Sequence, residues 1–180
     1  VQQYGGTCAS TPAEAAAGAD LVMLCVGNDN DVRSVVYGKQ GVLATMRPGS
    51  LLIDHTTASA DLARELALAC KKKGIGFLDA PVSGGQAGAV NGLLTIMLGG
   101  EAADFAKADA TLMKYARSAR LLGPAGSGQL AKMVNQICIA GVVQGLAEAV
   151  HFGKSAGLDI EKVVEVISKG AAGSWQMENR

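Results

Sequence analysis

The stretch GSGQLAKMVNQ, residues 126–136, lies where the pattern of the sequence changes, and it admits two interpretations. Gly126, Gly128 and Ala131 fit G-x-G-x-x-A, the looser form of the glycine-rich turn that binds a dinucleotide. Glu148 follows about where the ribose-binding acid of such a motif would fall. A true motif joins a strand to a crossover helix, and another strand should follow within about 30 residues. The sequence beyond the stretch therefore decides between the two interpretations.

That sequence favours a long helix over a nucleotide turn. Residues 129–156 contain no proline and only isolated glycines, which predicts about 28 residues of helix, roughly 40 Å long. Lys132, Asn135 and Gln136 then share one helix face. A lone lysine on a nearly uncharged helix is a candidate general acid, and a solvated surface lysine is the plainer alternative. Without a side chain at Gly128, a flat ligand could approach the helix beneath the amine.

Upstream of this helix, short apolar runs alternate with helical patterns. Continuous apolar runs are typical of parallel strands that are covered on both faces. The predicted strands are residues 19–27, 49–57, 75–83, 93–100 and 119–123. Their alternation with helices predicts right-handed crossovers and an open α/β fold, a doubly wound parallel sheet of the Rossmann type. We assign residues 1–124 to this partial dinucleotide-binding domain and residues 125–180 to the first part of an all-α domain.

Three polar segments follow predicted strands and should share one rim of the sheet. They are VGNDND (26–31), HTT (55–57) and SGGQAG (83–88). Ligands of open α/β sheets bind beyond the carboxyl ends of the strands, where these segments are expected. The serine and glycines of the third segment offer a hydroxyl and unobstructed N–H groups, which suit a carboxylate or phosphate. On residue types alone, a glycine-rich turn joining two strands is the favoured alternative for this segment.

Individual side chains at this rim are weaker candidates. Asn28, Thr56 and Thr57 could bind a cofactor ribose or amide, or could cap the next helix. Asp31 is another candidate for the cap of that helix. His55 could act as an acid or base, but an isolated histidine after a strand is more often structural.

The composition is that of a globular metabolic protein. Of 180 residues, 49% are hydrophobic, and the formal net charge is zero. A chain of this size buries a substantial core, and the lack of a basic stripe argues against a general nucleic-acid surface. No arrangement of histidine, cysteine and acidic residues has the spacing of a metal site.

The cysteines and the chain ends carry further expectations. Each cysteine lies in an apolar run, so we expect buried free thiols in a reducing cytoplasm. The cysteines are Cys8, Cys25, Cys70 and Cys138. No signal peptide is recognisable, and no apolar run reaches membrane-spanning length. The sequence starts in mid-pattern without Met and stops where nothing closes the fold, which we interpret as a fragment cut at both ends.

Two long motifs resemble one family of enzymes. FLDAPVSGGQAGAVNGLLTIMLGG (77–100) and GPAGSGQLAKMVNQ (123–136) resemble the β-hydroxyacid dehydrogenases, the group of 3-hydroxyisobutyrate dehydrogenase and tartronate semialdehyde reductase. CVGNDNDVRSVVYGKQGV (25–42), IDHTTAS (53–59) and AAGSWQMENR (171–180) are similar to further segments of that family, in its order. The resemblance implies oxidation of a small 3-hydroxy acid, or reduction of its semialdehyde, with NAD or NADP as cofactor.

The resemblance also assigns roles to residues. It implies that Lys132 is the catalytic lysine. The implied substrate-binding residues are Ser83, Gly84, Gly85, Asn135 and Gln136. The implied cofactor-binding residues are Val26, Gly27, Asn28, Asp31 and Thr57. No metal is implied.

The sequence departs from the family in two respects. Val26 and Gly27 stand where the family more often shows Leu-Pro. The family's first strand, its glycine-rich turn and the residue that selects NAD or NADP would precede Val1, and more of the helical domain would follow Arg180. We therefore expect this span alone to have negligible activity.

Two rival functions stay open. A 6-phosphogluconate dehydrogenase-like enzyme has a similar Ser-Gly-Gly segment and helix lysine, but shows His-Asn where this chain has Asn135 and Gln136. A non-catalytic binding or assembly relative is the other rival, and the presence of Lys132 speaks against it. Small residues along the long helix, at 140, 141, 145 and 147, indicate close packing on another helix, so we also expect a homo-oligomer.

Overall fold

A computed structural model describes residues 5–179 and divides the chain into two compact units. The first unit is Val1–Lys132 and the second begins at Met133. The domain boundary near residue 124 stays a prediction. The compact units divide later in the chain because the first residues of the long helix pack on the sheet.

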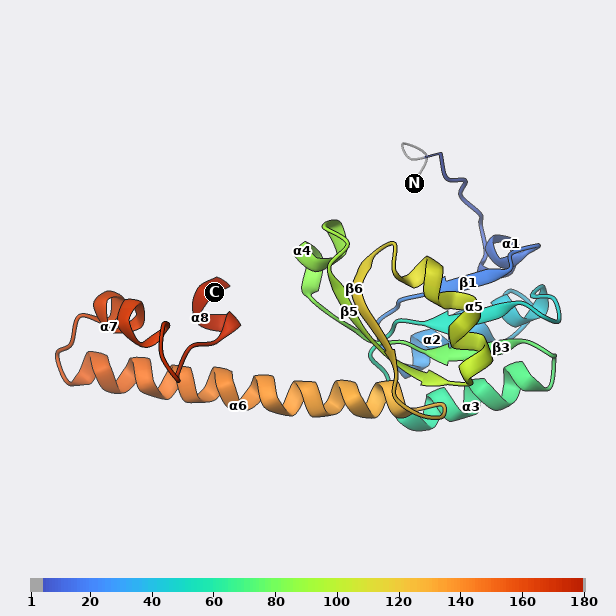
Figure 1. Ribbon diagram of the computed structural model, residues 1–180. Coiled ribbons are helices and arrows are strands. Elements are labelled where there is room, and N and C mark those ends of the chain that lie inside the picture. The colour runs from blue at the N-terminus through green and yellow to red at the C-terminus, as the bar shows by residue number, and fades with distance from the viewer. Residues whose placement is uncertain (1–4, 180) are drawn as a thin grey trace. The chain divides into compact units, whose positions relative to one another are not determined.

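The first unit contains a six-stranded sheet (Figure 1). Its strands are β1 Leu21–Leu24, β2 Leu51–Asp54, β3 Gly76–Asp79, β4 Val82–Ser83, β5 Leu94–Gly100 and β6 Ala116–Leu121. The order is β1-β2-β3-β5-β4, and β6 pairs with β5. β1, β2 and β3 are parallel, β5 runs antiparallel to both β3 and β4, and β6 is parallel to β5. The α/β class and the Rossmann-like architecture are confirmed.

The prediction of a parallel sheet is wrong for its second half, because the chain reverses between β4 and β5. The predicted third strand is two strands, β3 and β4, which are separated at Ala80 and Pro81. Helix α4, Gly85–Val90, then returns the chain to β5. This connection is shorter than the dozen or more residues that a parallel crossover needs, so β5 pairs in the antiparallel direction.

Helices cover both faces of the sheet, and β2 supplies side chains to both cores. Helices α1 (Pro12–Ala16), α2 (Asp29–Val36) and α3 (Ala60–Lys71) pack with Leu52 on one face. Helix α5, Ala102–Leu112, packs with Leu51 and Ile53 on the other face (Figure 1). This alternation is the two-residue period of a strand that is buried on both sides. A short 3₁₀ helix, Val42–Ala44, completes the first core.

Helix α6, Ser127–Ser155, confirms the predicted long helix with 29 residues. It is followed by α7, Ile160–Ile167, and α8, Trp175–Asn179, and no strand follows it among the described residues. The nucleotide-turn interpretation of residues 126–131 is therefore wrong. Asp159 caps the start of α7 with its carboxylate on the Lys162 N–H.

Two expectations about apolar segments need correction. Cys70 is buried, but Cys8, Cys25 and Cys138 are exposed, because an apolar neighbourhood in sequence does not decide which side of an element faces the core. Helix α6 also reaches membrane-spanning length and apolarity, with a mean hydropathy of 1.4 over its best window. No uninterrupted apolar run in the sequence has this length, but the interspersed Gly, Ala, Asn and Gln residues leave the mean hydropathy of the helix high.

Candidate active site

One buried carboxylate attaches the first turn of α6 to the end of β3. Asp79, the last residue of β3, is 0% exposed. Its Oδ1 accepts a hydrogen bond from the Gly126 N–H at 2.7 Å, and its Oδ2 accepts one from the Gln129 N–H at 2.9 Å. Burial raises the pKa of the Asp79 carboxyl, and these N–H groups oppose the rise. Hydrogen bonds to a charged group contribute about 1.5–3 kcal/mol each, which offsets much of the cost of burying it.

Gly128 lies against the sheet and not against open space. A Cβ atom at this position would lie 2.8 Å from the Asp79 carbonyl oxygen, and the Met97 carbonyl oxygen would be closer still. The prediction that a flat ligand approaches the helix here, beneath the Lys132 amine, is wrong, because main-chain atoms of β3 and β5 fill that space. The glycine instead permits the close contact between helix and sheet.

Gln129 fastens the same helix turn to the loop after β2. Its side chain is buried, with 1% of the residue exposed. The Nε2 atom donates to the Thr56 carbonyl oxygen at 2.7 Å, and Oε1 accepts from the Ala58 N–H at 3.0 Å. The amide thus satisfies one main-chain donor and one main-chain acceptor of that loop. Asp79 and Gln129 together hold α6 to two neighbouring strands.

Lys132 lies one turn after this attachment and is largely removed from water. The residue is 8% exposed, and its Nζ donates to the Val82 carbonyl oxygen at 2.8 Å. Burial lowers the pKa of the Lys132 ammonium, because the charged form loses hydration. A solvated surface lysine is therefore excluded. The catalytic role of the amine stays a prediction.

The Lys132 contact places its amine beside the serine–glycine segment, since Val82 directly precedes Ser83. Ser83 is half-buried and pairs with Thr95 on β5. Gly84 and Gly85 are exposed and have φ values of 129° and 60°. Both values lie where residues with a Cβ atom are strained. The segment begins α4, so the simple turn between two strands is wrong as a description. Its substrate-binding role stays a prediction.

Three of the predicted cofactor residues gather at the carboxyl ends of β1 and β2. The Val26 N–H donates to Thr56 Oγ1 at 3.0 Å, which joins the loops that follow these two strands. Gly27 and Thr57 are exposed on the two joined loops. Their main-chain and hydroxyl groups are therefore available to a ligand at the rim where open α/β sheets bind one.

Asn28 and Asp31 are engaged with each other at the start of α2. The Asn28 side-chain oxygen accepts from the N–H groups of Asn30 and Asp31, at 2.8 and 3.1 Å. Its Nδ2 donates to Asp31 Oδ2 at 2.8 Å. The helix cap, one of the two roles considered for Asn28, is thus observed, and Asn28 rather than Asp31 provides it. Contact of either residue with a cofactor stays a prediction.

His55 has a hydrogen-bond partner at each ring nitrogen. Nδ1 lies 2.7 Å from the Ala80 carbonyl oxygen and Nε2 lies 2.8 Å from the Tyr115 hydroxyl. A carbonyl only accepts, so Nδ1 carries a proton, and in the neutral ring Nε2 accepts from the Tyr115 hydroxyl. Burial lowers the pKa of His55, which favours this neutral form. Both nitrogens are occupied, in agreement with a structural role.

Asn135 and Gln136 belong to the second compact unit. The Asn135 Nδ2 donates to the Gln136 Oε1 at 3.0 Å. Their roles in substrate binding stay predictions that rest on the family resemblance and on helical spacing.

Comparison with known proteins decides the family. Residues 1–126 match the family model described as the NAD binding domain of 6-phosphogluconate dehydrogenase, and residues 126–180 match that described as NAD-binding of NADP-dependent 3-hydroxyisobutyrate dehydrogenase. The chain belongs to the 3-hydroxyisobutyrate dehydrogenase family.

Individual relatives agree with this assignment. All 180 residues align at 64% identity with an uncharacterized oxidoreductase of Shewanella frigidimarina, over 62% of that protein. A probable 3-hydroxyisobutyrate dehydrogenase-like protein of Arabidopsis thaliana is 43% identical over 98% of this chain and 59% of its own length. The structure of Mycobacterium tuberculosis 3-hydroxyisobutyrate dehydrogenase with L-serine gives a TM-score of 0.82 at 34% identity, over 93% of this chain and 56% of that one. The chain thus spans about three fifths of its curated relatives.

Sequence reasoning did not single out the buried polar residues that hold the first turn of α6 and the loop after β2. Asp54 and Asp79 each end a buried apolar strand, and Gln129 lies in the first turn of α6. A polar residue that closes an apolar run was the available signal, because such a side chain must find partners at the strand end.

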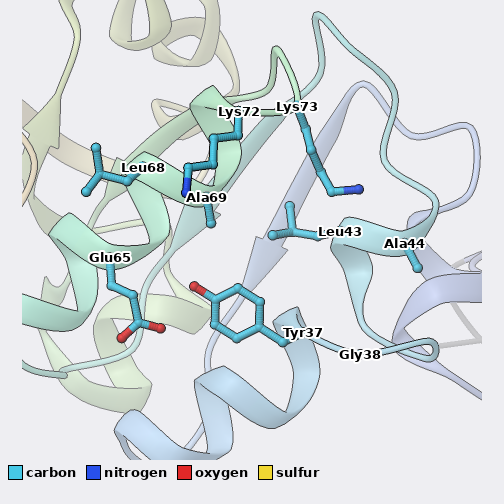
Figure 2. A pocket seen from close by; sticks show the side chains of 9 residues that line it. All are labelled: Tyr37, Gly38, Leu43, Ala44, Glu65, Leu68, Ala69, Lys72 and Lys73. Carbon is cyan, nitrogen blue, oxygen red and sulfur yellow. The ribbon is translucent and has the colours of Figure 1, made fainter.

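A separate cavity of about 520 Å³ lies away from these strand ends (Figure 2). Its lining residues lie beyond the C-terminus of α2, on the 3₁₀ helix, and along and just beyond the second half of α3. They are Tyr37, Gly38, Leu43, Ala44, Glu65, Leu68, Ala69, Lys72 and Lys73. Helix α3 runs from the carboxyl end of β2 to the amino end of β3, so the cavity lies towards the opposite edge of the sheet. Its lining includes none of the predicted site residues among those that the structure describes.

Asp54 gives the stability of this part of the chain a pH dependence. It is 2% exposed, lies opposite Asp79 in the strand register, and accepts from the Thr56 N–H at 2.8 Å. Burial raises the pKa of Asp54 from 3.8 to about 6. The folded chain therefore binds this proton more tightly than the unfolded chain, and stability is lost as pH rises through about 6.

We expect Asp54→Asn to remove this dependence. Relative to the variant, the free energy of unfolding of the unmodified chain should rise by about 1 kcal/mol when pH falls from 7 to 5. Urea denaturation at both pH values measures it. The exposed residue Asp109 provides the control, since Asp109→Asn should keep the pH dependence of the unmodified chain. A constant difference between D54N and the unmodified chain would contradict the buried titration.

Proposed function

We propose that the protein carrying this chain transfers hydride between nicotinamide and a small 3-hydroxy acid or its semialdehyde, with Lys132 as general acid and base. The observation that carries the proposal is the buried Lys132 amine, 2.8 Å from the carbonyl oxygen of the residue before Ser83. An ammonium group there lies beside exposed main chain that suits a carboxylate. The L-serine present with the M. tuberculosis relative is a small 3-hydroxy acid and supports this substrate class.

Each group of residues has a defined task in this proposal. Ser83, Gly84 and Gly85 bind the substrate carboxylate through the serine hydroxyl and main-chain N–H groups. Asn135 orients the reacting oxygen together with Lys132. When nicotinamide is bound, it supplies or accepts the hydride.

Proton transfer is the task of Lys132. During reduction, its ammonium stabilises the developing alkoxide and donates a proton to it. During oxidation, the neutral amine removes the hydroxyl proton. Burial of Lys132 lowers the pKa of the ammonium, which brings the amine closer to the range where both directions are accessible.

The rim residues fit a dinucleotide in part. Both matching family models describe NAD-binding domains, and Gly27 and Thr57 are exposed on loops joined by a hydrogen bond. We propose that the Gly27 main chain and the Thr57 hydroxyl contact the cofactor, which is NAD or NADP. Asn28 and Asp31 already satisfy each other in the cap of α2, so any contact of theirs must add to that cap.

We expect Lys132→Ala to lower kcat by roughly 10²–10⁴-fold, because the variant lacks the acid and base of the reaction. Hydride transfer should be followed by nicotinamide absorbance, in the chain extended to the length of its relatives. Lys154→Ala, on the same helix and exposed, serves as control and should keep kcat. Near-normal turnover by K132A would rule out the assignment.

A 6-phosphogluconate dehydrogenase-like activity is the second candidate, favoured by the description of the model that matches residues 1–126. We expect instead that kcat/KM is higher for L-serine and 3-hydroxyisobutyrate than for 6-phosphogluconate. Among the described residues, a hydrogen bond places one cation, Lys132, beside the serine–glycine segment. A single cation offsets only a small part of the free-energy cost of desolvating a phosphate. Steady-state rates on the three acids decide between the two, and preference for the phosphorylated acid would establish the rival.

We also propose a homo-oligomer that covers the apolar side of α6. Val134 and Ile137 are 63% and 72% exposed, and Gly141 and Gly145, on the same side of the helix, have room for close contact with another helix. Light scattering of the chain should give a mass above 18.2 kDa, and Ile137→Glu should reduce it towards that value. Glu148→Gln, which alters an already polar position, is the control. A monomeric unmodified chain would contradict the proposal.

A further inference from the structure

Three sets of hydrogen bonds hold the first turn and a half of α6, and they involve the last residue of β3 and the segments that follow β2 and β3. The Asp79 carboxylate binds the N–H groups of Gly126 and Gln129. The Gln129 side chain binds the loop after β2. The Lys132 amine binds Val82, three residues beyond Asp79 on the same segment.

We propose that Asp79 is a positioning residue for Lys132: its buried carboxylate holds the start of α6 on β3 and so fixes the amine at the Val82 carbonyl oxygen. The importance of this placement for turnover rests on the proposed role of Lys132 as acid and base. Asp79 itself lies 0% exposed beneath the helix and touches no reacting group.

The geometry leaves the helix little freedom while these contacts last. A Cβ atom added at Gly99 would lie 2.5 Å from Asp79, and one added at Gly128 would lie 2.8 Å from it, so helix and strands are already at the closest approach that glycine allows. A helix turn is rigid along its axis, and Lys132 follows Gln129 by three residues. Displacement of the first turn therefore displaces the root of the lysine side chain as well.

The carboxylate suits this task better than a neutral side chain. Its two oxygens accept from two N–H groups that have no partner within the helix, and its negative charge faces the positive end of the helix dipole. An Asn side chain has the same shape but presents one acceptor and one donor. In Asp79→Asn, one of the two N–H groups would face an NH₂ group and lose its bond.

The first readout is the Lys132 amine itself and needs no cofactor. Trace acetylation across a pH series, followed by mass spectrometry, gives the pH at which the Lys132 amine is half reactive. Added N-acetyl-lysine amide is the internal standard. In the unmodified full chain, this pH should lie below that of the standard, because burial lowers the pKa of the amine. In D79N it should move up towards the standard, as the amine becomes hydrated.

Asp104→Asn is the matched control. The Asp104 carboxylate also accepts from a main-chain N–H of β3, that of Phe77 at 3.2 Å, but it belongs to α5. Its loss should leave the Lys132 profile unchanged. Asp54→Asn is a second control, because Asp54 lies opposite Asp79 in the strand pair. It should show that loss of a nearby negative charge alone does not change the pH profile of Lys132 acetylation. An unchanged Lys132 profile in folded D79N would overturn the proposal.

Gly128→Ala provides a second route if D79N does not fold. The added Cβ atom would press the same helix turn away from Asp79 and Met97 without removing a hydrogen-bonding group. Gly141→Ala on the same helix adds a methyl group where nothing lies within 4 Å. G128A should shift the Lys132 profile and G141A should not, and equal profiles would overturn the proposal.

The second readout is turnover in the chain extended to the length of its relatives. D79N should lower kcat by about tenfold or more with a smaller change in KM, since a misplaced acid affects the chemical step. The experiments distinguish failure of the proposed function from failure of the proposed role of Asp79. If K132A keeps its turnover, the proposed function fails, and the acetylation result still decides whether Asp79 places the amine.

Discussion

The contact between the Asp79 carboxylate and the first N–H groups of α6 is the interaction on which the arrangement depends. It joins the last residue of a buried strand to the start of a helix of 29 residues. A buried carboxylate is costly unless it is fully paired, and the start of a helix is costly unless its free N–H groups find acceptors. Each group offsets part of the other's cost, so separating the carboxylate from the N–H groups is unfavourable. Gly99 and Gly128 permit the contact, because neither adds a Cβ atom between strand and helix.

The same attachment brings chemically different groups together. The chain after β3 carries both the carboxylate that holds the helix and the Val82 carbonyl that receives the Lys132 amine. It then continues directly into the serine–glycine segment. A shift of this strand end moves the amine and the segment together, so their separation is less sensitive to motion than if they belonged to independent loops. The loops that follow β1 and β2 are joined to the same region through Thr56 and Gln129.

Sequence patterns predicted the elements better than their directions. The apolar runs at β1, β2 and β5 were recognisable because a strand of a parallel sheet lacks polar alternation. The reversal between β4 and β5 was missed, although the connection between these strands is too short for a parallel crossover. The burial of cysteines was also misjudged, since Cys25 lies in an apolar run and yet faces outward. In the candidate site, the lysine was recognisable by its isolation on an apolar helix, whereas Asp79 resembled any polar residue at a strand end.

The sequence by itself determined the alternation of strands and helices, the long helix after Gly126 and the family, because periodicity and long motifs are local properties. Only the tertiary structure decided that the Lys132 amine is buried. Burial of the Lys132 amine depends on Val82, and the seating of its helix depends on Asp79, both about 50 residues away along the chain. Tertiary structure also decided that Gly128 faces the sheet instead of a ligand. Such pairings depend on which surfaces meet when the helix packs on the sheet. A local sequence pattern does not show which residues about 50 positions apart will come into contact.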